Sequence, residues 1–234
     1  MIKTKGELNE YLRLELHGSN NYISRIRDFV IKNESYYLRK YIITLRKTEF
    51  YYNNIDNFFY RLLYYIFLFK LKRLYYITKI ELYPNQVGKG LTLFHYTGDK
   101  QGAVKNAVIG EHVILRPGTV LGYQGDTMRE SLAAPVVGDY VEFSWGVKVF
   151  GGIKIGRGAV LNANCVPMSN IPPYSIVAGN PAKVIGFTKT PGEVIEFEKS
   201  RYNPEDRLSL ELLEKNYDKF FINRIKDIQK LTRI

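Results

Sequence analysis

The chain has little of what disulfide-stabilised or membrane-spanning proteins depend on. Its single cysteine, Cys165, excludes an intrachain disulfide and fits a reducing compartment. The longest apolar run, Leu62–Phe69, is far shorter than the ~20 residues that a bilayer-spanning helix needs. Residues 1–10 are polar and lack the apolar segment of a signal peptide. From these features we expect a cytoplasmic protein.

Acidic residues are in the minority. Lys and Arg outnumber Asp and Glu by 34 to 23, and residues 1–79 hold 15 of these bases against 7 acids. A basic surface favours nucleic acid, anionic lipid or an acidic substrate as a partner. No nucleic-acid-binding motif occurs in the sequence, so we expect no nucleic-acid partner.

Residues 1–79 have a helical pattern. Leu8, Leu12 and Leu16 recur at every fourth position, and a further helix is expected over residues 55–77. That helix is aromatic and basic, which leaves two interpretations open. It is either buried against the rest of the protein or in contact with an anionic membrane surface. The second interpretation would make the protein peripheral at the inner face of the membrane.

Residues 80–186 follow a six-residue period. An aliphatic or small residue begins each unit, and a small or β-branched residue usually stands at its fifth position. The first positions are Val87, Leu93, Ala103, Ile109, Leu115, Leu121, Val137, Phe143, Val149, Ile155 and Leu161. The fifth positions include Ala107, Val113, Thr119, Val141, Val147, Ala159 and Cys165. A period held over so many units predicts a repeat architecture, with three units per triangular coil and the first positions stacked inside.

The repeat is interrupted twice, within residues 97–102 and between Leu121 and Val137. The second interruption predicts an external loop at 123–135, a usual location for substrate contacts. Residues 187–234 return to a helical pattern, starting at Thr190 with Pro191 at the first helical position. The predicted organisation is therefore a helical region at 1–79, the coil stack at 80–186 and a helical tail at 187–234.

Two segments carry a family resemblance. VGKGLTLFHYTG, at 87–98, resembles the serine acetyltransferase signature, and IPPYSIVAGNPAKVIG, at 171–186, resembles the closing motif of hexapeptide-repeat acyltransferases. The resemblance implies a mainly β fold, a left-handed parallel β-helix, here with an N-terminal α-helical region and C-terminal α-helices. The flanking helices look more like those of capsule and O-antigen O-acetyltransferases.

The resemblance also implies that His95 is a general base. A neutral imidazole suits the removal of a proton from an alcohol, and the third position of a unit faces out of the coil. The family orients this histidine with an acidic residue about fifteen positions earlier. Position 80 is Ile, so Glu81 is the candidate for that role.

The acceptor is predicted from departures from the serine acetyltransferase pattern. Phe94 replaces the acidic residue before the histidine, and Ala133 and Ala134 replace an Arg-His pair. A sugar hydroxyl of a surface polysaccharide or its precursor is therefore expected, with Phe94, Tyr96 and Tyr123 as contacts. The alternatives are a serine O-acetyltransferase, an N-acetyltransferase of an amino-sugar nucleotide, or a β-helix scaffold without catalysis.

Acetyl-CoA as co-substrate and a homotrimer with active sites between subunits are further implications of the resemblance. The matching cofactor positions are Ser144, Trp145, Gly146, Lys148, Ala163, Ala178, Gly179 and Lys183. No metal is expected. Carbonic anhydrases of this fold hold their metal with three histidines, whereas only His95 and His112 lie in the repeat region.

Overall fold

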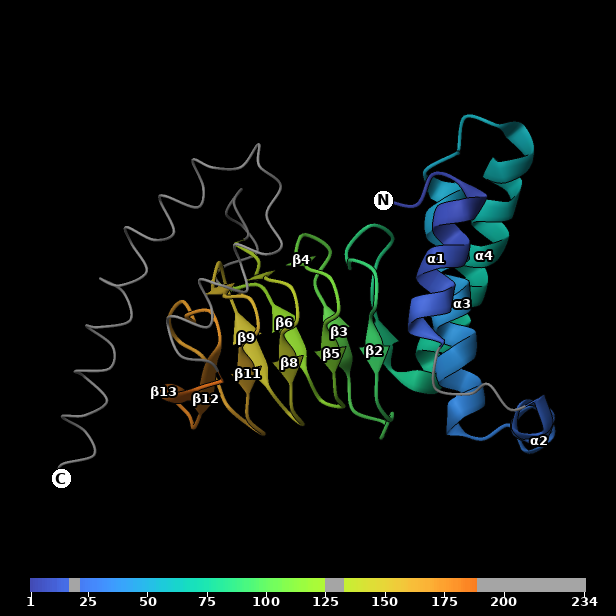
Figure 1. Cartoon of the computed structure of the whole chain (residues 1–234). Helices are drawn as coiled ribbons and strands as arrows, with labels where there is room; N and C mark the ends of the chain where they lie inside the picture. Colours follow the sequence, from blue (N-terminus) through green and yellow to red (C-terminus); the bar gives the residue numbers. More distant parts are fainter. Residues whose placement is uncertain (17–21, 125–132, 189–234) are drawn as a thin grey trace, which may run out of the picture.

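The computed structural model describes residues 1–16, 22–124 and 133–188, with a group of helices at one end of a stack of short strands (Figure 1). The helices are α1 (Lys5–Glu15), α2 (Tyr22–Ile31), α3 (Glu34–Tyr52) and α4 (Phe58–Thr78). Thr4 and Glu7 form a capping box on α1, and Asn33 and Asn57 cap α3 and α4. The chain leaves α4 through Lys79, whose backbone is left-handed at φ 57°, and enters the first strand at Ile80.

The described strands form three sheets, one on each side of the coil stack. The first holds β1 (Ile80–Glu81), β3 (Gln101–Ala103), β6 (Val120–Gly122) and β9 (Lys148–Phe150). The second holds β4 (Val108–Ile109), β7 (Val136–Val137) and β10 (Lys154–Ile155). The third, which we call the C sheet, holds β2 (Thr92–Leu93), β5 (Ile114–Leu115), β8 (Glu142–Phe143), β11 (Val160–Leu161), β12 (Ser175–Ala178) and β13 (Lys183–Phe187).

The six-residue period explains the strand register. In the C sheet, Leu93 pairs with Leu115, Leu115 with Phe143, and Phe143 with Leu161. The two other sheets align their first positions in the same way. The first positions, predicted to face inward, are all buried, and so are the fifth positions named above. The predicted stack of coils is confirmed. Strands of two or three residues form few ladder bonds, so continuous apolar columns supply most of the stabilisation.

The glycines at the second position of several units are explained by the spacing of the coils. A Cβ added to Gly88 would lie 2.8 Å from the backbone of Gly110, and one added to Gly110 would lie 2.7 Å from that of Gly138. Neighbouring strands are only ~4.8 Å apart. A side chain at these positions would therefore push the coils apart.

The predicted loop and tail fall largely outside the described residues. Gln124 and Ala133, which stand on either side of residues 125–132 in the sequence, form an isolated antiparallel bridge. Residues 125–132, the tail from 189 onward and His17 are not among the described residues.

The two ends of the stack differ. At the far end, β13 pairs antiparallel with β12 and ends the C sheet. At the near end the helices cover the first coil, and their buried apolar residues join the core of the β-helix. The residues that meet there are Tyr41, Ile42, Leu45, Leu71 and Leu74 from the helices and Ile80, Leu82 and Leu91 from the first coil.

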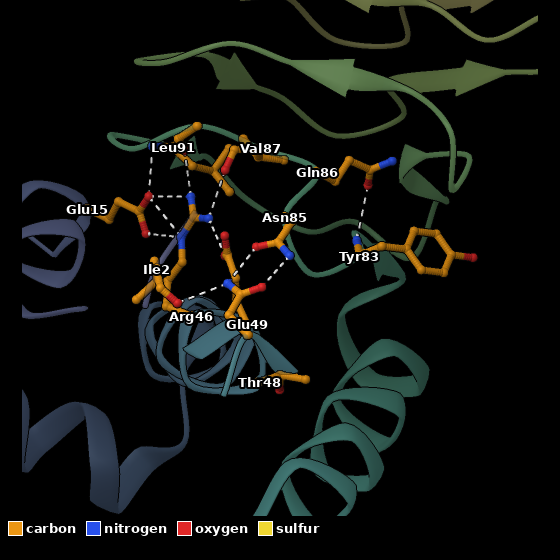
Figure 2. Close-up of polar contacts among 12 residues, drawn as sticks. Ile2, Glu15, Arg46, Thr48, Glu49, Tyr83, Asn85, Gln86, Val87 and Leu91 are labelled. Atoms are coloured by element: carbon orange, nitrogen blue, oxygen red, sulfur yellow. Dashed lines mark hydrogen bonds and ion pairs between the residues drawn. The ribbon is translucent and has the colours of Figure 1, made fainter. Parts of the chain in front are cut away.

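A buried arginine joins the helices to the first coil (Figure 2). Arg46 of α3 donates through Nε and Nη2 to the carboxylate of Glu15, at 2.6 to 3.1 Å, and through Nη1 to Glu49 Oε2 at 2.8 Å. It also donates to the carbonyl oxygens of Val87 at 2.9 Å and Gly88 at 2.7 Å. These three charged side chains are at most 2% exposed, and burial raises the pKa of Glu49 even though Arg46 opposes that shift.

Two neighbouring contacts reinforce this junction. Asn53 and Asn85 exchange amide hydrogen bonds of 2.9 and 2.7 Å, as Figure 2 shows for Asn85. The hydroxyl of Tyr41 accepts the backbone N–H of Leu82 at 3.0 Å, and burial raises the pKa of this phenol. Several polar groups of the first coil are thus satisfied by helix side chains, which fixes the helices on the stack.

Replacing Arg46 tests this junction. We expect Arg46→Met to lower the free energy of unfolding by about 3–5 kcal/mol, because Glu15 and Glu49 would stay buried without their cation. Urea denaturation measures this. The exposed Arg73→Met is the matched control and should stay within about 0.5 kcal/mol of the parent. Equal stability of the two variants would contradict the assigned role of Arg46.

Candidate functional site

His95 stands at the turn that follows β2. Its backbone is left-handed, with φ 53°, and its side chain is 57% exposed. A left-handed backbone is uncommon for a residue with a Cβ and tends to occur at functional sites and tight turns. The imidazole therefore projects out of the coil stack and is accessible to a substrate.

Glu34, the first residue of α3, holds this turn in place. Its Oε2 lies 3.0 Å from His95 Nδ1, and its Oε1 accepts the backbone N–H of Tyr96 at 2.6 Å. An ionised carboxylate only accepts hydrogen bonds, so this contact assigns the proton of the neutral ring to Nδ1. The lone pair is then on Nε2, which leaves that nitrogen able to act as a base.

Glu81, the carboxylate expected beside His95, has other partners. Its side chain lies 2.8 Å from Lys100 Nζ and accepts the hydroxyl of Tyr83 at 2.8 Å. Burial acts to raise the pKa of Glu81, but the hydrogen bonds from Lys100 and Tyr83 outweigh it and hold that pKa below its usual range. Burial and the same carboxylate raise the pKa of Tyr83 to about 12. The expectation that Glu81 lies beside His95 is therefore wrong, and the carboxylate at the imidazole is that of Glu34.

Sequence spacing could not have identified Glu34. It precedes His95 by 61 residues and belongs to a different structural region. The available signal was local: Asn33 caps a helix whose first residue is acidic, an arrangement favoured by the helix dipole. Only the packing of α3 on the first coil brings that helix end to the histidine.

Several predicted cofactor residues follow the strands of the C sheet, as His95 does. Ser144 and Trp145 come after β8, Ala163 after β11, and Gly179 after β12, whose last residue is Ala178. These strands are parallel and in register, so their carboxyl ends form one edge of the stack. The spacing of ~4.8 Å per strand puts His95 and Gly179 roughly 19 Å apart along that edge.

Trp145 is the member of this set that meets His95. The two ring centroids are 5.9 Å apart with an interplanar angle of 32°, and Trp145 is 43% exposed. Gly146 next to it has φ 72°, a conformation in which glycine is unstrained. Lys148 Nζ donates to the carbonyl of Gly118, and Lys183 is exposed on β13.

The predicted acceptor contacts divide between two places. Phe94 and Tyr96 flank His95, with Phe94 40% exposed and Arg116 5.3 Å from its ring centroid. Arg116 is itself paired with Glu142. Tyr123, by contrast, follows β6 in the sheet of Glu81, and its charge contributes to the raised pKa of Tyr83.

Two hollows adjoin the histidine and share Glu34 and His95. The first, of about 490 Å³, is lined by Glu34, His95, Tyr96, Thr97 and Trp145. The second, of about 400 Å³, lies on the side of the helices and is lined by Glu15, Leu16, Glu34, Ser35, Leu38, Arg39, Ile42, Thr92, Leu93, Phe94 and His95. An imidazole between two hollows can contact two different molecules. Among the described residues, no group of three His, Cys, Asp or Glu side chains could hold a metal ion.

Sequence comparison finds relatives among serine acetyltransferases. Serine acetyltransferase 4 of Arabidopsis thaliana is 37% identical over 125 residues, which are 52% of this chain and 34% of that protein. The serine acetyltransferase of Mycobacterium tuberculosis is 36% identical over 118 residues, half of each chain. The chain thus spans between one third and one half of the length of these curated relatives. No protein-family model matches it.

Solved structures of serine acetyltransferases share the fold. That of Brucella abortus is 25% identical, with a TM-score of 0.59 over 78% of this chain and 70% of that one. That of Neisseria gonorrhoeae is 23% identical, with a TM-score of 0.56 over 80% and 69%. These relatives support the hexapeptide-repeat acyltransferase superfamily. They do not support a capsule or O-antigen subtype. The structural neighbours have a left-handed β-helix, the winding that the resemblance implies for this chain.

The contact between His95 and Trp145 has a spectroscopic consequence. Trp145 is the only tryptophan of the chain, and a histidine ring against an excited indole alters its fluorescence. We expect His95→Ala to change the intensity of the Trp145 emission, because it removes the ring that lies beside the indole. His112→Ala is the control, because His112 stacks on Tyr140 instead, at 4.8 Å. Trp145 emission that is the same in His95→Ala as in the parent would show that the two rings are apart in solution.

Proposed function

We propose that the protein is an acetyl-CoA-dependent O-acetyltransferase in which His95 Nε2 is the general base. The observation that carries this proposal is the contact of Glu34 with Nδ1, which leaves Nε2 unprotonated on a side chain that lines both hollows. The relatives named serine acetyltransferases support acetyl transfer as the reaction class.

The proposed reaction follows from this arrangement. Nε2 of His95 takes the proton of the acceptor hydroxyl as its oxygen attacks the thioester carbonyl. The imidazolium that forms is stabilised by the carboxylate of Glu34. It then returns the proton to the departing CoA thiolate when the carbon–sulfur bond breaks, which gives the acetyl ester and free CoA. The base is thereby restored for the next turnover.

We infer that acetyl-CoA approaches along the edge from Trp145 to Gly179 and that the acceptor enters the hollow on the side of the helices. The edge offers backbone groups of successive coils, with exposed Lys183 beside its far end as a partner for phosphate. The second hollow brings Phe94, Thr92 and Arg39 next to the base. The homotrimer and its intersubunit sites remain a prediction, which light scattering would test.

Two acceptor classes compete. The names of the relatives favour serine over the sugar expected from the sequence. The observation that still favours a sugar is the exposed ring of Phe94 beside His95, since an apolar face suits a pyranose better than a zwitterion. Serine is thus the first acceptor to test, and a surface-glycan sugar the second.

The decisive experiment measures CoA release with serine, amino-sugar nucleotides and surface-glycan sugars as acceptors. We expect acetyl transfer to one hydroxyl-bearing class and a fall in kcat of roughly 10²–10⁴-fold in His95→Ala. His112→Ala should retain the parental rate. Full activity in His95→Ala would refute the assigned base, and transfer to an amine would replace the O-acetyltransferase proposal.

Glu34 is a positioning residue in this proposal and is tested separately. A glutamine amide would donate to Nδ1 and so favour the tautomer with the proton on Nε2. We therefore expect Glu34→Gln to lower kcat by about 10- to 100-fold, less than for a fully buried triad carboxylate. The KM for acetyl-CoA should change less than kcat, because Glu34 shares only the first hollow with Trp145 and most of the edge up to Gly179 lies away from it.

Glu34→Asp is the matched variant, since it keeps the carboxylate and should recover part of the rate. A Glu34→Gln protein whose kcat equals that of the parent would remove Glu34 from the mechanism. A rise in KM alone would make it a binding residue instead.

A further inference from the structure

Helix α4 presents a large apolar surface that no described residue covers. Phe58, Phe59 and Tyr76 are each 71% exposed, and Phe69 is 63% exposed. The complete surface, here called the α4 face, consists of Phe58, Phe59, Leu62, Tyr65, Ile66, Phe69, Tyr76 and Ile77. Exposed apolar patches of this kind usually mark a site of interaction.

The α4 face is separate from the face of α4 that holds the protein together. The helix buries Leu71, Leu74 and Thr78 toward the core that it shares with α3 and the first coil. Phe58, Leu62, Tyr65, Phe69 and Tyr76 recur at intervals of three, four or seven residues, so they form one stripe along the exposed side. The part of the chain that the structure describes therefore leaves this stripe exposed and able to contact a partner.

Basic residues border the stripe. A turn of about 100° per residue puts Arg61 and Lys72 along one border, Lys70 along the other and Arg73 within the stripe. All four are exposed, and Lys70 lies 4.8 Å from the ring centroid of Phe67. Residues 58–78 include no Asp or Glu, and Asp56 just before the helix is the nearest acid in the sequence.

We propose that the α4 face lies on an anionic membrane surface, with its aromatic stripe at the depth of the headgroups and its cations on lipid phosphates. A helix with an apolar stripe between rows of Lys and Arg is the arrangement of interfacial membrane helices. Tyr65 and Tyr76 suit this layer, because a phenol ring is apolar and its hydroxyl reaches water. None of the described helices has the length and apolarity to cross a bilayer, so this helix lies on the surface.

A second copy of the chain fits this face less well. Two such faces would bring Arg61, Lys70, Lys72 and Arg73 against their equivalents, with no acid in the helix to pair with them. Lysine is depleted in protein interfaces, whereas Lys70 and Lys72 border the stripe. An anionic membrane surface instead attracts each of these cations, and each one raises the affinity for the membrane several-fold.

Vesicle sedimentation of the full chain tests the proposal independently of the acetyl-transfer reaction. The probes are phosphatidylcholine vesicles with and without phosphatidylserine. We expect binding to the anionic vesicles that weakens as salt rises, and about fivefold weaker binding for Lys72→Gln. Leu62→Glu/Phe69→Glu should lose binding, because it puts two carboxylates in the stripe.

The control is Met168→Glu, which puts a carboxylate at a 68% exposed apolar residue of the β-helix and should bind as the parent does. Circular dichroism melting checks that each variant is folded. No sedimentation with anionic vesicles would overturn the proposal, as would equal binding of the Leu62→Glu/Phe69→Glu protein. A double variant that loses only self-association, measured by light scattering, would assign the face to a second copy.

Discussion

The contact of Arg46 with Glu15, Glu49 and the first coil is the constraint on which the arrangement of this protein depends. A buried ion pair gains little net stability, because desolvation of the charges offsets their attraction. What this ion pair adds is a fixed relative placement of the elements that it joins. A planar guanidinium with five donors satisfies two carboxylates and two carbonyls only in one relative placement of α1, α3 and the coil.

That placement reaches the candidate site through α3. Arg46 lies in the middle of the helix and Glu34 is its first residue, so holding the helix against the coil also positions the carboxylate at its end. Glu34 in turn contacts both the ring of His95 and the backbone of Tyr96. The helical region thus closes the first coil and also completes the environment of the histidine, which the β-helix alone leaves exposed and in a left-handed conformation.

The coil stack places the residues that pack its core and the residues that form its site at different positions of each coil. Its interior is filled by columns of Leu, Val, Ile and Phe, which repeat every six residues and tolerate little change in volume. Its turns lie outside those columns, so their side chains vary without disturbing the core. His95, Trp145 and Gly179 can therefore line one edge while the columns behind them remain regular. The proposed path for acetyl-CoA uses the repetition itself, since each coil adds the same backbone groups one strand further along.

The amino-acid sequence by itself determined the coil stack, its register and the outward position of His95, because the six-residue period has a direct spatial meaning. It also indicated the helices before residue 79 and the interruption that begins after Leu121. It could not decide which acid contacts His95, and Glu81 was preferred because it stands one position from the family spacing of about fifteen residues before the histidine. Only the tertiary structure brought Glu34 to the histidine and gave Glu81 to Lys100. The physical reason is that a periodic pattern reports contacts between neighbouring coils, whereas the docking of a helix depends on buried side chains that follow no period.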